Sequence, residues 1–201
     1  MTYALRTAAW VPQAPGRDPG EAARLAVQWT ERQCRQEHAR AILVTSTREQ
    51  FEVPELAEFS KQHSHVTRRS QQRLAGEVPV LAYLPDTEDL DFATRLAGSS
   101  SLAVVESDAF PLCGWAAWLE ASDLVSGEAT PGLGAVTRDA LDRFAFYGNN
   151  AFDDDFGRER ARAVLAELRG RGKLDRDLLL GAALAAGLSA HAVKNLGRLI
   201  A

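Results

Sequence analysis

Three short apolar runs constrain the fold of this chain more than any other feature. They span residues 41–45, 78–84 and 102–106, and each is almost uninterrupted by polar residues. Strands that alternate polar with apolar residues have one face in water, whereas continuous apolar strands are typical of parallel sheets that are covered on both faces. The sequence therefore predicts a parallel sheet with helices packed against it.

Amphipathic helices are expected between these runs. The first extends over residues 19–38, with Asp18 suited to its N-cap and Pro19 to its first turn. Further helices are expected near 54–62, from Asp86 to about Gly98, and around Trp115. Because strands alternate with helices, we expect an α/β fold with a small parallel sheet similar to those of Rossmann-like proteins. Leu124 and Val125 are the expected start of a last strand.

The chain is expected to divide into an α/β domain, a connection and a helical domain. A stretch rich in glycine and proline, 127–134, interrupts the alternation, and the elements expected after it are all helices. We assign residues 1–127 to the α/β domain, 128–152 to a linker with a connecting helix, and 153–201 to a C-terminal domain of three helices. Residues 1–155 carry 14 Lys and Arg against 23 Asp and Glu, a net charge of −9, whereas residues 156–201 carry 9 against 4, a net charge of +5. The C-terminal helices are therefore basic.

Features that would indicate a membrane or an oxidising compartment are missing. No apolar run approaches the roughly 18 residues that a helix needs to span a bilayer, and the first ten residues do not resemble a signal peptide. The two cysteines, Cys34 and Cys113, fall in different expected helices, which favours reduced thiols. We therefore expect a cytoplasmic protein without membrane contact.

The motifs of common nucleotide and metal enzymes are also missing. The sequence has no GxxxxGK[ST] loop, no GxGxxG after a strand, no HExxH, no paired CxxC and no GxSxG elbow. No metal site is expected, and the sequence leaves any cofactor unknown.

Polar residues follow each apolar run, where an open parallel sheet binds its ligands. Ligands of such sheets lie in the crevice outside the carboxyl ends of the strands. The candidates for this crevice are Thr45, Ser46, Thr47, Asp86, Thr87, Glu106, Ser107 and Asp108. Helix capping by Asp86 and ordinary turn chemistry by the serines and threonines are the alternative interpretation.

Three smaller clusters have a structural and a functional interpretation, and the structural one is preferred for each. A basic cluster is either an anion site or a charged edge strand over 66–70; its members are His63, His65, Arg68, Arg69 and Arg73. The run Asp153–Asp155 either binds a cation or caps a helix. Cys113 is either a nucleophile near a helix N-terminus or a packed thiol.

The segment from 178 to 200 has the most specific pattern in the chain. It places a small residue, Ala183, four residues before Gly187, and an aliphatic residue, Val193, six residues after that glycine. Ser189 is positioned to cap the second helix. This pattern resembles the helix-turn-helix of bacterial DNA-binding proteins. The resemblance implies that the helix starting at Ser189 lies in the major groove of DNA, supported by a helix near 156–170.

The resemblance also implies two sets of nucleic-acid contacts. His191, Lys194 and Asn195 would face base edges, and five arginines would reach phosphates: Arg158, Arg160, Arg162, Arg169 and Arg171. The same pattern describes any compact helical hairpin that docks on its own sheet or on another protein. The expected partners are therefore DNA or a protein, with a homo-oligomer as a further option.

Two functions fit these features. The preferred one is a regulatory or binding protein, in which an α/β domain senses a ligand or partner and is coupled to the helix-turn-helix-like module. The alternative is a small enzyme that acts in the crevice, with Asp86, Glu106 or Asp108 as its acid or base.

Overall fold

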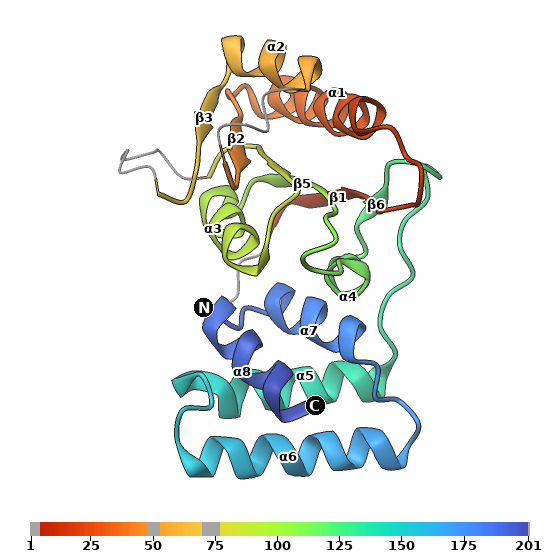
Figure 1. Cartoon of the computed structure of the whole chain (residues 1–201), viewed down its shortest axis with the longest axis vertical. Helices are drawn as coiled ribbons and strands as arrows, with labels where there is room; N and C mark the ends of the chain where they lie inside the picture. The colour runs from red at the N-terminus through yellow and green to blue at the C-terminus, as the bar shows by residue number, and fades with distance from the viewer. Residues whose placement is uncertain (1–4, 48–52, 70–76, 201) are drawn as a thin grey trace. The chain divides into compact units, whose positions relative to one another are not determined.

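The structure is a computed structural model, and it describes residues 5–47, 53–69 and 77–200 (Figure 1). The chain divides into two compact units. The α/β unit consists of Tyr3–Phe110 and Ala121–Thr130, and the helical unit contains Pro111–Glu120 and Pro131–Ala201. A helix from the middle of the chain thus groups with the C-terminal helices, and the segment that follows it returns to the α/β unit.

The α/β unit contains a six-stranded sheet in which every ladder is parallel, as the sequence predicts. The strand order is β3-β2-β4-β5-β1-β6. The strands are β1 (Thr7–Val11), β2 (Ile42–Thr45), β3 (Ser64–Val66), β4 (Val80–Tyr83), β5 (Ser101–Val105) and β6 (Ser122–Asp123). The three apolar runs form β2, β4 and β5, which are buried along their whole lengths.

Three strands differ from the sequence-based expectation. β1 was not expected, because its alanines are poor strand formers, yet it pairs with β5 and β6. β3 ends at Val66, so Arg68 and Arg69 follow the strand and do not belong to it; Arg73 lies outside the described residues. β6 begins two residues before the expected start at Leu124. The sequence did not locate it because this edge strand is short and carries no apolar pattern.

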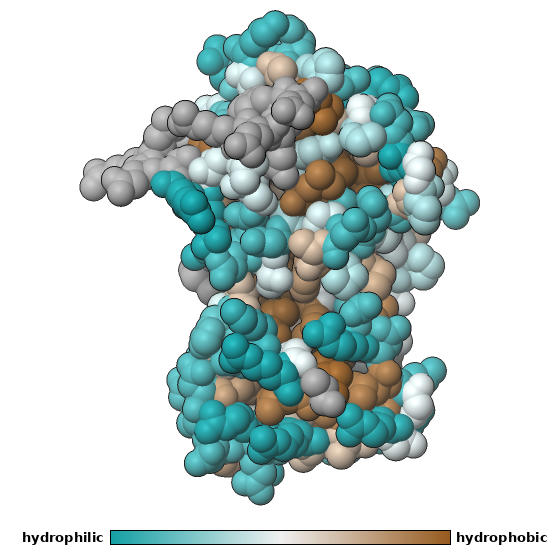
Figure 2. Space-filling view, viewed as in Figure 1, coloured by the Kyte–Doolittle hydropathy of each residue, from teal (hydrophilic) through white to brown (hydrophobic). Residues whose placement is uncertain are grey.

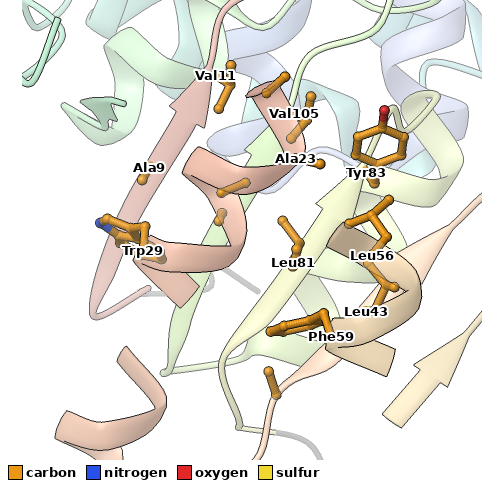
Figure 3. Close-up of a cluster of buried hydrophobic side chains, with 14 of the residues drawn as sticks. Ala9, Val11, Ala23, Trp29, Leu43, Leu56, Phe59, Leu81, Tyr83 and Val105 are labelled. Atoms are coloured by element: carbon orange, nitrogen blue, oxygen red, sulfur yellow. The ribbon is translucent and has the colours of Figure 1, made fainter. Parts of the chain in front are cut away.

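Helices cover both faces of this sheet (Figure 1). α1 (Pro19–Glu37) and α2 (Pro54–Gln62) pack on one face, and α3 (Thr87–Ala97) packs on the other. Successive residues of a strand point to opposite faces, so each strand contributes to both layers of the core. Figure 3 shows the layer under α1 and α2, where Leu43 and Leu81 from the sheet lie beside Leu56 and Phe59 from α2.

The helical unit consists of five α-helices and a 3₁₀ turn among the described residues. They are α4 (Cys113–Leu119), α5 (Ala135–Tyr147), the turn η2 (Gly148–Asn150), α6 (Asp155–Gly170), α7 (Arg176–Ala185) and α8 (Ala190–Ile200). Gly114 lets α4 approach α7 closely, since a Cβ atom there would lie 1.8 Å from the carbonyl oxygen of Leu178. On the other side of this crossing, a Cβ atom on Gly181 would lie 2.8 Å from the backbone nitrogen of Trp115. Over the part of the chain that the structure describes, no helix has the length and apolar character needed to cross a bilayer.

Candidate functional site

The eight crevice candidates separate into two groups at the carboxyl edge of the sheet. One group surrounds the ends of β2 and β3 and the first turn of α3, and the other surrounds the ends of β1, β4 and β5. The sequence predicted that all eight lie at this edge, but it did not divide them into two groups. The order of the strands in the sheet does so.

The first group is organised by Asp89, a carboxylate in the first turn of α3 whose side chain is only 4% exposed. Its carboxylate accepts a hydrogen bond from the Ser46 hydroxyl and lies 3.4 Å from Nε of Arg68. Arg68 also forms an ion pair with Glu88. A buried carboxylate is costly unless it is paired and hydrogen-bonded, and these partners meet that requirement. This network ties the ends of β2 and β3 to α3.

The other candidates of this group have structural partners as well. The Thr45 hydroxyl donates to the carbonyl oxygen of Thr47 over 2.8 Å and lies 2.7 Å from Nε2 of His65. Asp86 caps α3, because its side chain accepts the backbone N–H of Asp89 over 2.8 Å, and Thr87 begins that helix. The capping interpretation of Asp86 therefore accounts for its position.

The residues of the basic cluster lie in the same region but have separate partners. Nδ1 of His63 accepts the backbone N–H of Ala41 over 3.1 Å, and burial lowers the pKa of His63, which favours its neutral form at pH 7. His65 contacts Thr45, and Arg68 is paired with carboxylates. His63, His65 and Arg68 thus each contact a different group.

The second group lines a cavity of about 310 Å³. The cavity opens at the carboxyl ends of β4 and β5, beside the first turn of α1 and the segment that leads into it. Its lining consists of Gln13, Arg17, Pro19, Ala22, Tyr83, Leu84, Val105, Ser107 and Asp108. Ser107 and Asp108 are the two crevice candidates that reach it. Glu106 instead points to the segment after β1, where it accepts the backbone N–H of Gln13 over 2.7 Å.

The backbone of Arg17 is held in place by its local sequence. Pro15 and Gly16 occupy the centre of a tight turn, in which Gly16 has a φ of 78° and the N–H of Arg17 donates to the carbonyl oxygen of Ala14 over 3.1 Å. Proline followed by glycine suits a type II turn, since the third position needs a positive φ. Asp18 then caps α1 by accepting the N–H of Glu21 over 3.1 Å. Arg17 is thus held between a turn and a helix cap.

The side chain of Arg17 leaves a hydrogen-bond donor unused. Its Nε atom is buried, and no acceptor among the described residues bonds to it. Most buried polar atoms in native proteins have a partner, so each exception calls for a physical explanation.

Tyr83 lies at the same end of the sheet. It is the last residue of β4, and Figure 3 shows its hydroxyl at the end of the core where Val11 and Val105 also lie. Burial raises the pKa of Tyr83, and the nearby carboxylates of Glu55 and Asp18 raise it further. The phenol is therefore a neutral hydrogen-bond donor near pH 7.

The helix-turn-helix-like segment has well-defined local geometry. Gly187 has a φ of 100°, and the N–H of Leu188 donates to the carbonyl oxygen of Ala183 over 3.0 Å, which closes the end of α7. Ser189 precedes α8 and accepts the N–H of Ala192 over 3.2 Å. Ala183 and Val193 are both buried where the two helices pack.

Two of the three candidate base-contacting residues already have partners within the helical unit. Nε2 of His191 lies 3.3 Å from the carboxylate of Asp153, and the amide of Asn195 donates to the same carboxylate over 3.0 Å and to the Ala151 carbonyl over 2.9 Å. Lys194 is exposed on α8. The first half of α8, which carries His191 and Asn195, thus contacts the segment that precedes α6.

The five candidate arginines lie on α6 or directly after it. Arg158 forms an ion pair with Asp155 over 2.7 Å, and the guanidinium of Arg160 lies 5.2 Å from the ring centre of Phe156. Arg162, Arg169 and Arg171 are exposed. The helical unit as the structure defines it carries 11 Lys and Arg against 10 Asp and Glu, a net charge of +1. The positive charge of the C-terminal sequence is therefore largely balanced within the unit.

The three aspartates before α6 act separately. Asp154 caps the helix by accepting the N–H of Gly157 over 2.5 Å, which lowers the pKa of Asp154. Asp155 pairs with Arg158, and Asp153 contacts α8. Over the described ranges, no three His, Cys, Asp or Glu side chains come together in a group that could hold a metal ion.

Sequence reasoning did not select Arg17, Tyr83 or Asp89 as site residues. The Pro-Gly turn before Asp18 was visible in the sequence and could have marked Arg17 as a fixed side chain. Nothing local distinguishes Asp89 from the acids that ordinarily begin helices. Comparison of the chain with protein-family models, with curated proteins and with solved structures found no match.

Proposed function

We propose that this protein senses a small molecule in its α/β unit and contacts a partner macromolecule through its helical unit. The observation that carries the proposal is the cavity at the carboxyl edge of the sheet, with the side chain of Arg17 in its lining. Open parallel sheets bind ligands at this edge. A volume of about 310 Å³ is at the small end of ligand pockets, which suits a metabolite-sized molecule.

The backbone at the cavity supports a binding role. Leu84 lines the cavity with a φ of 49°, in the left-handed region that costs a residue with a Cβ atom about 1 kcal/mol. Its N–H donates to the carbonyl oxygen of Val105 over 3.0 Å, which helps to hold it there. Backbone strain of this kind clusters at ligand sites, where the surrounding structure maintains it.

The carboxylates favour binding over acid–base catalysis. Asp86 caps α3, and Glu106 is bonded to the backbone of Gln13. Only Asp108 of the three candidate catalytic carboxylates lines the cavity, and it is exposed. A general base needs a tuned pKa and a fixed position, and an exposed carboxylate on a loop offers little of either.

A fragment screen tests the ligand-binding part of the proposal. The full chain, labelled with ¹⁵N, would be titrated with a library of polar metabolites and followed by amide chemical shifts. The expected result is a saturable change at Gln13, Ala22, Tyr83 and Asp108, with the amides of α3 unchanged. The proposal would be contradicted if no compound at about 10 mM shifted any of these four amide signals. Dissociation constants above about 10 mM are too weak for a useful sensor.

For the helical unit, we propose a protein partner, which is better supported than DNA. His191 and Asn195 are engaged with Asp153, and the unit has almost no net charge. The aromatic side chains of Phe146 and Phe156 are 77% and 61% exposed. Exposed aromatic side chains are typical of protein interfaces, whereas DNA binding depends on concentrated positive charge. Figure 2 shows hydrophobic residues among hydrophilic ones on the visible face of this unit.

DNA binding is tested by fluorescence anisotropy of a labelled duplex. We expect no binding by the full chain at about 50 mM salt, where even weak phosphate contacts are detectable. Binding that falls steeply with salt and is weakened by Lys194→Ala, but not by Arg24→Ala on α1, would instead establish DNA as the partner. Arg24 is a suitable control because it is an exposed cation of the α/β unit.

A further inference from the structure

The charge of Arg17 indicates which chemical group the cavity takes. Arg17 lines the cavity, and none of the ion pairs found among the described residues involves its guanidinium. Arginine stays charged at any pH that a cell encounters, so this donor cannot be neutralised by losing a proton. Hydrogen bonds from a guanidinium to an anion are shorter and stronger than those between neutral groups. A carboxylate or phosphate is therefore the acceptor that would stabilise Arg17 most.

The backbone of Arg17 is fixed before any ligand arrives. The Pro-Gly turn holds its backbone on one side, and the cap formed by Asp18 holds it on the other. An arginine on a fixed backbone loses less conformational entropy on binding than one on a mobile loop. The rest of the lining contains the apolar side chains of Ala22 and Val105 together with the phenol of Tyr83.

The other charged group of the lining limits the charge of the ligand. Asp108 faces the same cavity as Arg17, so a polyanion would meet repulsion there. The volume of about 310 Å³ also excludes a large ligand.

We propose that the cavity binds a small organic anion, whose single carboxylate or phosphate group accepts a hydrogen bond from the guanidinium of Arg17 and whose apolar part packs against Val105 and Ala22. This inference rests on the ligand-binding function proposed above. It concerns the shared chemistry of the anionic group, and the two anion types are separated by experiment.

The test uses four probes that share an aromatic ring and differ in their polar group. Phenylacetate and phenyl phosphate are the anionic probes, phenylacetamide is neutral and 2-phenylethylamine is cationic. Each would be titrated into the ¹⁵N-labelled full chain while the amides of Gln13, Ala22 and Tyr83 are followed. We expect at least one anion to bind about tenfold more tightly than the amide or the amine, because only an anion pairs with the guanidinium. The tighter of the two anions identifies the group.

Two matched variants assign the binding to Arg17. Arg17→Gln should weaken the preferred anion about tenfold or more, whereas Arg24→Gln, a change at an exposed arginine on α1, should leave its affinity unchanged. Unchanged amide spectra away from the cavity would show that each variant is folded.

The outcomes separate this inference from the proposed function. If the amide or the amine binds as tightly as the anions, or if Arg17→Gln retains full affinity, anion recognition by Arg17 is wrong while the cavity remains a binding site. If the four probes fail but the fragment screen yields a ligand of another class, the same conclusion holds. If neither the probes nor the screen moves the cavity amides, both the inference and the proposed function are wrong.

Discussion

Replacing Gly114 with alanine tests the close crossing of α4 and α7 that defines the helical unit. The new Cβ atom would lie 1.8 Å from the Leu178 carbonyl oxygen and 2.8 Å from the Ala182 nitrogen. Both neighbours are backbone atoms, so no side chain can rotate away to relieve the overlap. Because a normal contact between carbon and oxygen is about 3.3 Å, the two helices must separate locally by on the order of 1 Å.

The energetic cost follows from the packing. Overpacking in a dense core costs typically 1–3 kcal/mol, and a clash with a rigid backbone is expected near about 3 kcal/mol. Alanine offsets about 1 kcal/mol of this through its higher helix propensity. The net loss of about 2 kcal/mol corresponds to a melting temperature about 10 °C lower for a unit of this size.

Differential scanning calorimetry of the full chain measures this shift, and circular dichroism at 222 nm reports the loss of helix. Gly170→Ala is the matched control, because that glycine also lies in a helix but a Cβ atom there would meet nothing within 4 Å. The control should melt at or slightly above the wild-type temperature. If Gly114→Ala and Gly170→Ala melt together, the crossing is looser than the structure indicates and the argument from packing is refuted.

Three further predictions concern single side chains. Cys113 is exposed, so the prediction of a packed thiol there is wrong, whereas burial raises the pKa of Cys34 to about 11. Iodoacetamide at about pH 8 should therefore label Cys113 much faster than Cys34, as followed by mass spectrometry, and equal rates would contradict the burial of Cys34. Asp89→Ala should lower the free energy of unfolding in urea by about 1–3 kcal/mol, because the Ser46 hydroxyl loses its acceptor, and Asp89→Asn should lose less. The pKa of Asp154 is lowered in the folded state by the Gly157 N–H, so its stabilisation is present above the pKa of the unfolded chain and lost as the pH falls through the folded value. Asp154→Ala should therefore lower the melting temperature at pH 7 and have a smaller effect at pH 2, and an equal effect at both would rule out this linkage.

Much of the α/β unit could be predicted from short stretches of sequence. The continuous apolar runs identified β2, β4 and β5, and the capping residues Asp18 and Asp86 located the starts of α1 and α3. These predictions succeeded because hydrophobic periodicity and helix capping act between residues a few positions apart. β1 was missed for a related reason, since its alanines carry little strand preference and its burial is imposed by the neighbouring strands.

The candidate site could be predicted only in part. The sequence identified Ser107 and Asp108 at a carboxyl edge, but it did not indicate that they share a cavity with Arg17, which lies far away in the chain. Their position around one cavity depends on the pairing of β1 with β5, and strand order is set by contacts between residues far apart in the chain. Asp89 is similar, because its buried network requires β2 and β3 to end beside α3.

The sequence by itself determined that this protein has a parallel sheet buried between helices, followed by helices with defined caps and turns. Those properties follow from the local balance of apolar burial and backbone hydrogen bonding. The tertiary structure alone decided that α4 joins the C-terminal helices, through glycines at 114 and 181 that let two helix backbones meet. It also decided that Arg17 lines one cavity with Ser107 and Asp108, because only packing between distant segments brings these residues together.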